Sequence, residues 1–145
     1  MRKLSIEEAK QIELDILAYI DSFCKKHNIN YFINYGTLIG AIRHKGFIPW
    51  DDDVDINIPR ESYDKLVSLC NACKDFSDHY YLQSPNSHPE LGLHVSQIRK
   101  RGTVARRKYD HSADECGISI DLYIVENVYD NVVKRFFQGY TSMFL

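Results

Sequence analysis

Helical and strand-like segments alternate along the sequence, which predicts an α/β (α+β) protein with a mixed sheet flanked by helices. Two long stretches, 6–27 and 60–76, show the apolar spacing of amphipathic helices, and short β-branched and aromatic runs lie between and after them. The 145 residues are 44% hydrophobic and 26% charged, as in ordinary globular proteins. This length suits a single domain, 1–145.

The first predicted helix begins after Ser5 and runs to about His27. Ser5 followed by Glu8 is a capping box, and apolar residues then recur at helical spacing. Asn28 is a plausible helix stop.

A first strand is predicted at 29–35, "INYFINY", because the run is short, aromatic and β-branched. Gly36 turns the chain, and a short helix is expected over 37–44. A second strand, "VDINIP" at 54–59, ends at its proline, and the helix over 60–76 follows.

The second half of the chain predicts further strands. "HYYLQS" at 79–84 is one, and "PNSHPE" after it is a loop on its proline and polar content. Over 91–107 we expect a strand, a turn at Gly102 and a second strand. "GISIDLYIVENV" at 117–128 is another strand, and a last helix is expected to begin at Asp130.

Charge and hydropathy limit the function classes. The net charge of −2 argues against a wholly basic nucleic-acid-binding protein. Charges interrupt the N-terminal segment every few residues, unlike a signal peptide, and no window approaches the roughly 18 to 20 apolar residues that span a bilayer. The chain is predicted to be cytoplasmic, with peripheral contact at the inner face of the membrane as an alternative.

The cysteines are Cys24, Cys70, Cys73 and Cys116. Cys70 and Cys73 form a C-x-x-C motif, but it lies inside a predicted helix and no second pair follows at zinc-ribbon spacing. We expect reduced, largely buried thiols. A structural zinc site is the alternative.

Four aspartates are crowded in "WDDDVDINIPR", at the start of the second strand. Because alternate side chains of a strand share a face, Asp53, Asp55 and Asn57 should lie together, with Asp51 on the same parity and Val54, Ile56 and Ile58 in the core. Two carboxylates roughly 7 Å apart repel by about 2 kcal/mol at an effective dielectric of 20. A divalent cation would reverse this repulsion, and a solvated acidic edge is the alternative.

Calcium binding by an EF-hand is excluded. Asp51, Asp53 and Asp55 match the first three ligand positions of such a loop, but glycine and glutamate are required at its sixth and twelfth positions. Those positions are Ile56 and Ser62 here. Mg²⁺ fits better, because it takes one or two carboxylates together with phosphate oxygens.

The segment before the aspartates is suited to phosphate binding. The strand–turn–helix order around Gly36 and Thr37 presents free N–H groups and the positive end of a helix dipole, although the same dipeptide also serves ordinary turns. Arg43 is the candidate for a diphosphate, because its guanidinium binds phosphate bidentately. His44 and Lys45 suit either a phosphate role or a solvated helix end.

A phosphate-binding turn followed by Asp-x-Asp on a strand is the layout of the nucleotidyltransferase fold. That fold requires a third carboxylate on a neighbouring strand, and Asp121 in "SIDLY" is the candidate. The alternative for Asp121 is an ordinary outward-facing residue.

At this point the sequence resembles a specific family. "YGTLIGAIRHKGFIPWDDDVDINIPRESYDKL", together with "IRKRGTVARR" and "GISIDLYIVEN", is similar to the signature of the LicD family of phosphocholine transferases, which are related to the fukutin-type ribitol-phosphate transferases. The resemblance covers most of the chain. It implies a nucleotidyltransferase-like fold and transfer of phosphocholine from CDP-choline to a hydroxyl of a cell-surface glycan such as lipopolysaccharide, teichoic acid or capsule. The positions that match family site residues are Gly36, Thr37, Arg43 and Trp50 for the donor, Asp51, Asp53 and Asp55 for the metal, and Asp121.

The resemblance also implies a mechanism. Asp53 and Asp55 would hold Mg²⁺, or alternatively Mn²⁺, against the CDP diphosphate, and CMP would leave. Asp121 would either complete the metal site or accept the proton of the acceptor hydroxyl. For Trp50, ordinary core packing is an equal alternative.

Other features leave the function open. The basic run from Arg99 to Lys108 suits a loop over phosphates or a solvated hairpin tip, and without an aromatic platform it does not indicate RNA binding. Family members are usually longer, and the last helix shows no evident C-cap, as in a truncated piece. The rival functions are a nucleotidyltransferase that uses an NTP and a non-catalytic nucleotide-binding remnant.

Overall fold

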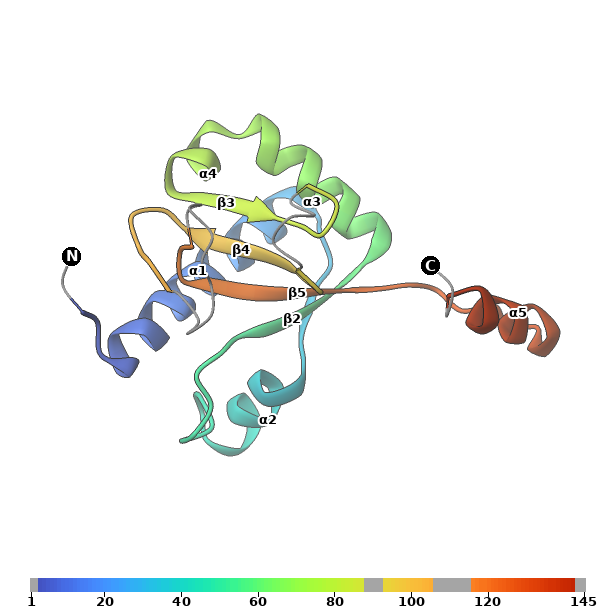
Figure 1. The fold of residues 1–145 in the computed structure, drawn as a ribbon, viewed down its shortest axis with the longest axis horizontal. Coiled ribbons are helices and arrows are strands. Elements are labelled where there is room, and N and C mark those ends of the chain that lie inside the picture. The colour runs from blue at the N-terminus through green and yellow to red at the C-terminus, as the bar shows by residue number, and fades with distance from the viewer. Residues whose placement is uncertain (1–2, 88–92, 106–115, 143–145) are drawn as a thin grey trace.

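The structure, a computed structural model, describes residues 3–87, 93–105 and 116–142. Its strands are β1 (Phe32–Ile33), β2 (Asp55–Pro59), β3 (Tyr80–Gln83), β4 (Ser96–Lys100) and β5 (Ser119–Val125). They form one five-stranded sheet in the order β1-β2-β5-β4-β3, in which β2 and β5 are parallel and the other neighbours are antiparallel (Figure 1). The helices are α1 (Ile6–His27), α2 (Tyr35–Arg43), α3 (Arg60–Ala72), α4 (Lys74–His79) and α5 (Val132–Ser142). This arrangement confirms the predicted fold class.

The first helix begins and ends as its sequence predicts. The N–H of Glu8 donates to the hydroxyl of Ser5, and the N–H of Ser5 donates to the carboxylate of Glu8, which completes the capping box. Asn28 ends the helix in the left-handed conformation, φ 51°, with its N–H bonded back to the last turn.

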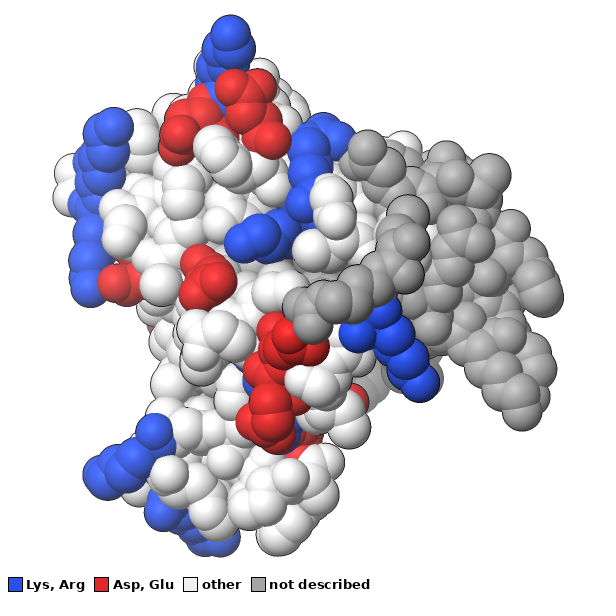
Figure 2. Space-filling model, turned by 90° about the vertical axis from the view of Figure 1, so that its left-hand side faces the viewer, with Lys and Arg blue, Asp and Glu red and all other residues white. Residues whose placement is uncertain are grey.

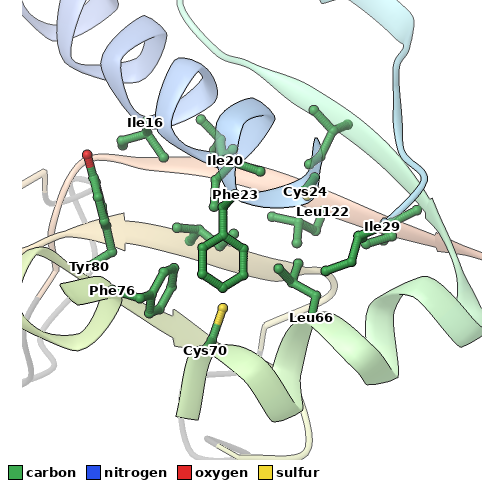
Figure 3. Close-up of a cluster of buried hydrophobic side chains, with 14 of the residues drawn as sticks. Ile16, Ile20, Phe23, Cys24, Ile29, Leu66, Cys70, Phe76, Tyr80 and Leu122 are labelled. Atoms are coloured by element: carbon green, nitrogen blue, oxygen red, sulfur yellow. The ribbon is translucent and has the colours of Figure 1, made fainter. Parts of the chain in front are cut away.

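The core lies on one face of the sheet, under α1, α3 and α4 (Figure 3). Ile16, Ile20 and Phe23 of α1 meet Leu66 of α3 and Phe76 of α4 there. From the sheet come residues at alternate positions, namely Ile56, Ile58, Ile98, Ile120 and Leu122, which are all fully buried. Their alternation leaves the opposite face of the same strands for polar side chains.

The helix predicted over 60–76 is wrong in one respect, because it is broken at Cys73. This residue has an extended backbone, φ −94° and ψ 110°, and separates α3 from α4. The change of direction buries Phe76 against Phe23 and Tyr80. Tertiary packing therefore overrides the continuous helical pattern.

The strands around two predicted turns are also shorter than expected. Only Phe32 and Ile33 pair with β2, and Tyr35 already begins α2. After Gly102, residues 103–105 form no strand, and 106–107 lie outside the described residues. The hydroxyl of Thr103 donates to the carbonyl of Lys100 and accepts from the N–H of Ile118, so single hydrogen bonds replace the expected ladder.

All four cysteines are free thiols, and Cys24, Cys70 and Cys116 are buried, in agreement with the prediction of reduced, largely buried cysteines. Cys73 is half-buried at the helix break. Burial raises the pKa of Cys24 to about 11 and that of Cys70 to about 12. These thiols are therefore protonated at neutral pH and pack as small apolar side chains.

The last helix, α5, lies apart from the sheet, beyond the extended segment that follows β5 (Figure 1). It begins at Val132, two residues later than predicted, because the side chain of Asn131 accepts hydrogen bonds from the N–H groups of Val133 and Lys134. None of its residues is buried. Across the described ranges, every helix is too short or too polar to cross a membrane.

Candidate functional site

The register of the sheet brings two of the predicted carboxylates together. Asp55 on β2 and Asp121 on β5 are directly paired across the parallel strands, and Asp121 is paired in turn with Gln97 on β4. All three side chains occupy the sheet face opposite the core, because their neighbours Ile56, Leu122 and Ile98 point into it. Asp121 is thus placed on a neighbouring strand, as the nucleotidyltransferase layout requires.

The carboxylate of Asp121 is held by a chain of side-chain hydrogen bonds. Nε2 of Gln97 donates to Oδ1 of Asp121 at 2.7 Å. Arg99 donates to Oε1 of Gln97 at 2.5 Å and to the carbonyl of Gly117 at 2.6 Å. This series of hydrogen bonds orients the Asp121 carboxylate through Oδ1, and Gln97 does not engage its second oxygen.

Gln97 was missed by the sequence analysis. The signal was available, since Gln97 and Arg99 occupy the polar positions of the alternating strand "SQIRK". Arg99 had been considered as part of a basic loop over phosphates, but its guanidinium is engaged inside the sheet. Arg101 likewise donates to the carbonyl of Ser77 and lies over the ring of Tyr81. The rest of the run, 106–108, lies outside the described residues.

The turn before α2 is joined to the aspartate strand. The hydroxyl of Thr37 accepts a 2.8 Å hydrogen bond from the backbone N–H of Asp55. Asn34, whose own side chain makes no capping bond, donates its N–H to the carbonyl of Asp55. Thr37 therefore positions Asp55 rather than standing open to a ligand.

Gly36 lies directly against Asp51. A Cβ atom added at Gly36 would collide with Oδ2 of Asp51, so glycine is required by the closeness of this carboxylate. Asp51 thus lies at the N-terminal end of α2, where the helix dipole favours an anion. The place that was predicted for a donor phosphate is taken by a side-chain carboxylate in this structure.

The aspartates form a crowded negative site. Burial, together with Asp53, Asp121 and Asp51, raises the pKa of Asp55 to about 6. Burial and the neighbouring carboxylate of Asp51 also raise the pKa of Asp53. Among the described residues, no lysine or arginine forms an ion pair with any of these aspartates. Figure 2 shows acidic side chains gathered in the middle of one face, with most basic ones around them.

Burial corrects one detail of the strand prediction. Val54, Ile56 and Ile58 lie in the core as expected, but the opposite side chains of Asp55 and Asn57 are only 8% and 6% exposed. Asp55 and Asn57 are therefore nearly buried rather than solvated, whereas Asp53 is exposed and Asp121 is half-buried.

A further carboxylate, Glu13, reaches this site from α1 and was also missed. It is buried, and its Oε2 has no hydrogen-bond partner. Burial, followed by the charges of Asp53, Asp52 and Asp121, raises the pKa of Glu13 to about 8 against a smaller opposing effect of Lys10. Its helical position, three residues before Ile16, placed it on the buried side of α1.

The carboxylates can supply only part of a metal coordination shell. Within residues 3–87, 93–105 and 116–142, no three histidine, cysteine, aspartate or glutamate side chains converge enough to hold an ion together. Mg²⁺ is usually held by one or two carboxylates and by substrate phosphates rather than by a protein cage. Asp53 and Asp55 form no ion pair with a described lysine or arginine and fit that kind of partial site, whereas a closed structural zinc site has no counterpart in the described part.

Two predicted donor-binding residues lie outside this group. Arg43 is exposed in the last turn of α2, at the end of the helix away from Gly36. His44 and Lys45 next to it are exposed as well. Trp50 is 83% exposed, so the core-packing interpretation of this residue is wrong. It immediately precedes Asp51 and offers a free aromatic surface beside the carboxylates.

An apolar pocket of 310 Å³ lies between α1 and α2, behind the turn that carries Thr37. Its lining includes Leu14, Leu17, Ala41 and Phe47. The lining also includes Thr37 and Lys45, but it is mostly apolar and suits an apolar group better than a diphosphate.

Comparisons with known proteins identify the family of this chain. Residues 28–143 match the family model described as "LicD/FKTN/FKRP, nucleotidyltransferase domain". The chain is 32% identical over 128 residues, 88% of its length, to the "Lipopolysaccharide cholinephosphotransferase LicD" of Haemophilus influenzae, of which the match covers 47%. It is also 42% identical over 62 residues, 42% of its length, to uncharacterized proteins of Rickettsia typhi and Rickettsia prowazekii, of which the matches cover 20% and 23%. The chain thus spans about half, or less, of the relatives it matches. On these matches, the chain belongs to the LicD family of nucleotidyltransferase-fold domains.

Proposed function

We propose that this chain binds a CDP-linked donor with Mg²⁺ and transfers phosphocholine, or a similar phospho-alcohol, to a hydroxyl of a cell-surface glycan. The similarity to a lipopolysaccharide cholinephosphotransferase supports phosphocholine and lipopolysaccharide as the first candidates. The observation that carries the proposal is the pairing of Asp55 with Asp121 beside the Gly36 turn. This pairing offers acidic metal ligands and a helix N-terminus within one site.

In this proposal Asp53 and Asp55 hold the ion, with Mn²⁺ as the alternative metal. The ion would neutralise the charge that develops on the bridging oxygen as CMP leaves. Thr37 keeps Asp55 in place through the backbone N–H of that residue. Because the carboxylates repel one another in the free protein, cation binding relieves a strain that the fold maintains.

Asp51 has a different role in the free protein. Its carboxylate occupies the start of α2, and we infer that a donor phosphate displaces it from there. Once turned away from Gly36, Asp51 is free to join Asp53 on the metal. The N–H groups at 36–37 then bind the phosphate.

Oδ1 of Asp121 accepts the hydrogen bond from Gln97, and two roles are open to its second oxygen. This oxygen either completes the metal shell or accepts the proton of the attacking hydroxyl. Because the hydrogen bond from Gln97 fixes the orientation of the Asp121 carboxylate, less entropy is lost when this carboxylate acts as the base. Trp50 is proposed to stack on the nucleobase of the donor, and Arg43 as a phosphate contact stays a prediction.

The test is product analysis with Mg²⁺ and separate donors. Incubation with CDP-choline should release CMP, in a Mg²⁺-dependent reaction that EDTA stops. Release of pyrophosphate from an NTP, without release of CMP from CDP-choline, would instead identify a nucleotidyltransferase. Calorimetric binding of CDP-choline without any turnover would reduce the function of this chain to donor binding.

A further inference from the structure

Two tyrosines lie beside the carboxylates on the polar face of the sheet. Tyr123 follows Asp121 by two residues on β5, so both side chains leave the same face. The ring of Tyr35, at the start of α2, meets the ring of Tyr123 edge to face, with centroids 5.1 Å apart and planes at 65°. Tyr35 remains 53% exposed, so the aromatic surface of the pair is open to a ligand.

The surroundings of this tyrosine pair are acceptor-rich. Asn57 is the strand partner of Tyr123, is only 6% exposed, and its Oδ1 has no hydrogen-bond partner. Asp55 and Asp121 are paired on the same two strands, each two residues before Asn57 and Tyr123, so their carboxylates leave the same face of the sheet. The unpartnered oxygen of Asn57 therefore adds partial negative charge beside the two rings and presents no donor from that atom.

Aromatic faces together with carboxylates and few donors suit a cation that itself has no N–H to donate. A quaternary ammonium is such a cation, and it is recognised by aromatic rings through cation–π attraction. A neutral nucleobase, by contrast, would need directed hydrogen-bond donors as well as a stacking surface. The summed negative charge of the site carboxylates (Asp51, Asp53, Asp55 and Asp121) is larger than the positive charge of one divalent ion. A negative potential from these side chains therefore remains after metal binding.

We propose that Tyr35 and Tyr123 receive the quaternary ammonium of the donor, with Asn57 and Asp121 beneath it. This inference rests on the proposed function. It adds the residues that would make the site select choline as the transferred alcohol. Tyr35 has a left-handed backbone, φ 48°, which a tyrosine rarely adopts, and such strained conformations cluster at ligand sites.

The experiment measures binding of CDP-choline, CDP-ethanolamine and CDP by calorimetry at saturating Mg²⁺. The unmodified chain should bind CDP-choline about threefold to tenfold more tightly than CDP-ethanolamine, which differs only at the ammonium group. Tyr35→Leu and Tyr123→Leu should each lose this preference and leave CDP affinity unchanged, whereas Tyr35→Phe should keep it. Tyr129→Leu is the matched control, because Tyr129 is equally exposed but lies in the segment before α5, away from the carboxylates.

The outcomes separate this inference from the proposed function. If the unmodified chain binds CDP-choline in a Mg²⁺-dependent manner and the leucine variants bind it equally well, the tyrosine pair is not the ammonium site, and the proposed function stands. Equal loss of CDP and CDP-choline affinity would assign the pair to the nucleotide or to folding and overturn the inference. If the unmodified chain binds neither compound, both proposals fail.

Discussion

The backbone N–H of Asp55 donates a 2.8 Å hydrogen bond to the hydroxyl of Thr37. This bond joins the start of α2 to the first residue of β2. In the proposed function, a donor phosphate at the turn and a cation at the strand would be linked through this side chain.

Replacement of Thr37 tests this link. Thr37→Val leaves the N–H of the nearly buried Asp55 without an acceptor and should lower the free energy of unfolding by about 1–2 kcal/mol. Thr37→Ser keeps the hydroxyl and should stay within about 0.5 kcal/mol of the unmodified chain. Urea unfolding monitored by circular dichroism measures both. Equal stability of the two variants would show that the bond contributes nothing.

The effect of Gly36→Ala on stability should change sign when Asp51 is removed. Gly36→Ala should destabilise the chain by about 1–3 kcal/mol, because the new Cβ meets Asp51. In an Asp51→Ala background the same change should stabilise by about 0.5–1 kcal/mol, since alanine is the better helix former. A double-mutant cycle by urea unfolding measures the coupling. If Gly36→Ala costs the same in both backgrounds, Asp51 does not lie on the helix start.

The pH dependence of stability follows from Glu13 and Asp55, whose folded pKa values of about 8 and about 6 exceed the ordinary values of 4.5 and 3.8. The folded state then binds more protons than the unfolded state between about pH 4 and pH 8. Stability is therefore fully present below this window and decreases as the pH rises through it. Unfolding free energies measured from pH 4.5 to pH 9 should show this decline.

Glu13→Gln identifies the main source of this decline. Glutamine keeps the shape but carries no charge, so the variant should gain on the order of 1 kcal/mol at pH 8.5 and almost nothing at pH 4.5, after allowance for solvent screening. Glu61→Gln, an exposed position in the first turn of α3, is the control and should not flatten the profile. A profile that Glu13→Gln leaves unchanged would place the titration elsewhere.

Gln97 is expected to act through Asp121. Gln97→Leu removes the donor to Oδ1 of Asp121 and leaves Arg99 without one of its acceptors, which should cost about 1–3 kcal/mol of stability. Gln97→Glu keeps an acceptor for Arg99 but replaces the donor to Asp121 with a carboxylate, and it should also lower the stability because the two carboxylates repel. Urea unfolding of both variants measures the loss. Unchanged stability of Gln97→Leu would show that the hydrogen bond to Asp121 contributes nothing.

Local pattern was sufficient for much of this fold. The capping box at Ser5, the core alternation of Val54, Ile56 and Ile58, and the pairing of Asp121 with the aspartate strand all followed from periodicity and motif. The predictions that were wrong concern features that depend on contacts between residues distant in sequence. Cys73 breaks a regular helical pattern because Phe76 is needed in the core, and no local rule contains that requirement.

The same limit applied to the site. Glu13 joins it only because α1 crosses the sheet near Asp53, and Gln97 only because β4 is paired with β5. Asp51 was predicted as a metal ligand, and its contact with Gly36 depends on how the loop over 44–54 folds back on α2. Apart from Asp121, which the layout of the nucleotidyltransferase fold predicted, the residues that were found belong to one continuous motif, and Glu13 and Gln97, which come from other elements, were missed.

The central claim is that these carboxylates share a divalent cation with the diphosphate of the donor. The most direct measurement is calorimetric titration of CDP-choline with Mg²⁺ and with EDTA, for the unmodified chain, Asp55→Asn and the surface control Asp64→Asn. We predict Mg²⁺-dependent binding that Asp55→Asn abolishes and Asp64→Asn preserves, together with a gain of about 1 kcal/mol in the metal-free stability of Asp55→Asn from relieved repulsion. Donor affinity that is the same in EDTA, or unchanged in Asp55→Asn, would contradict the account.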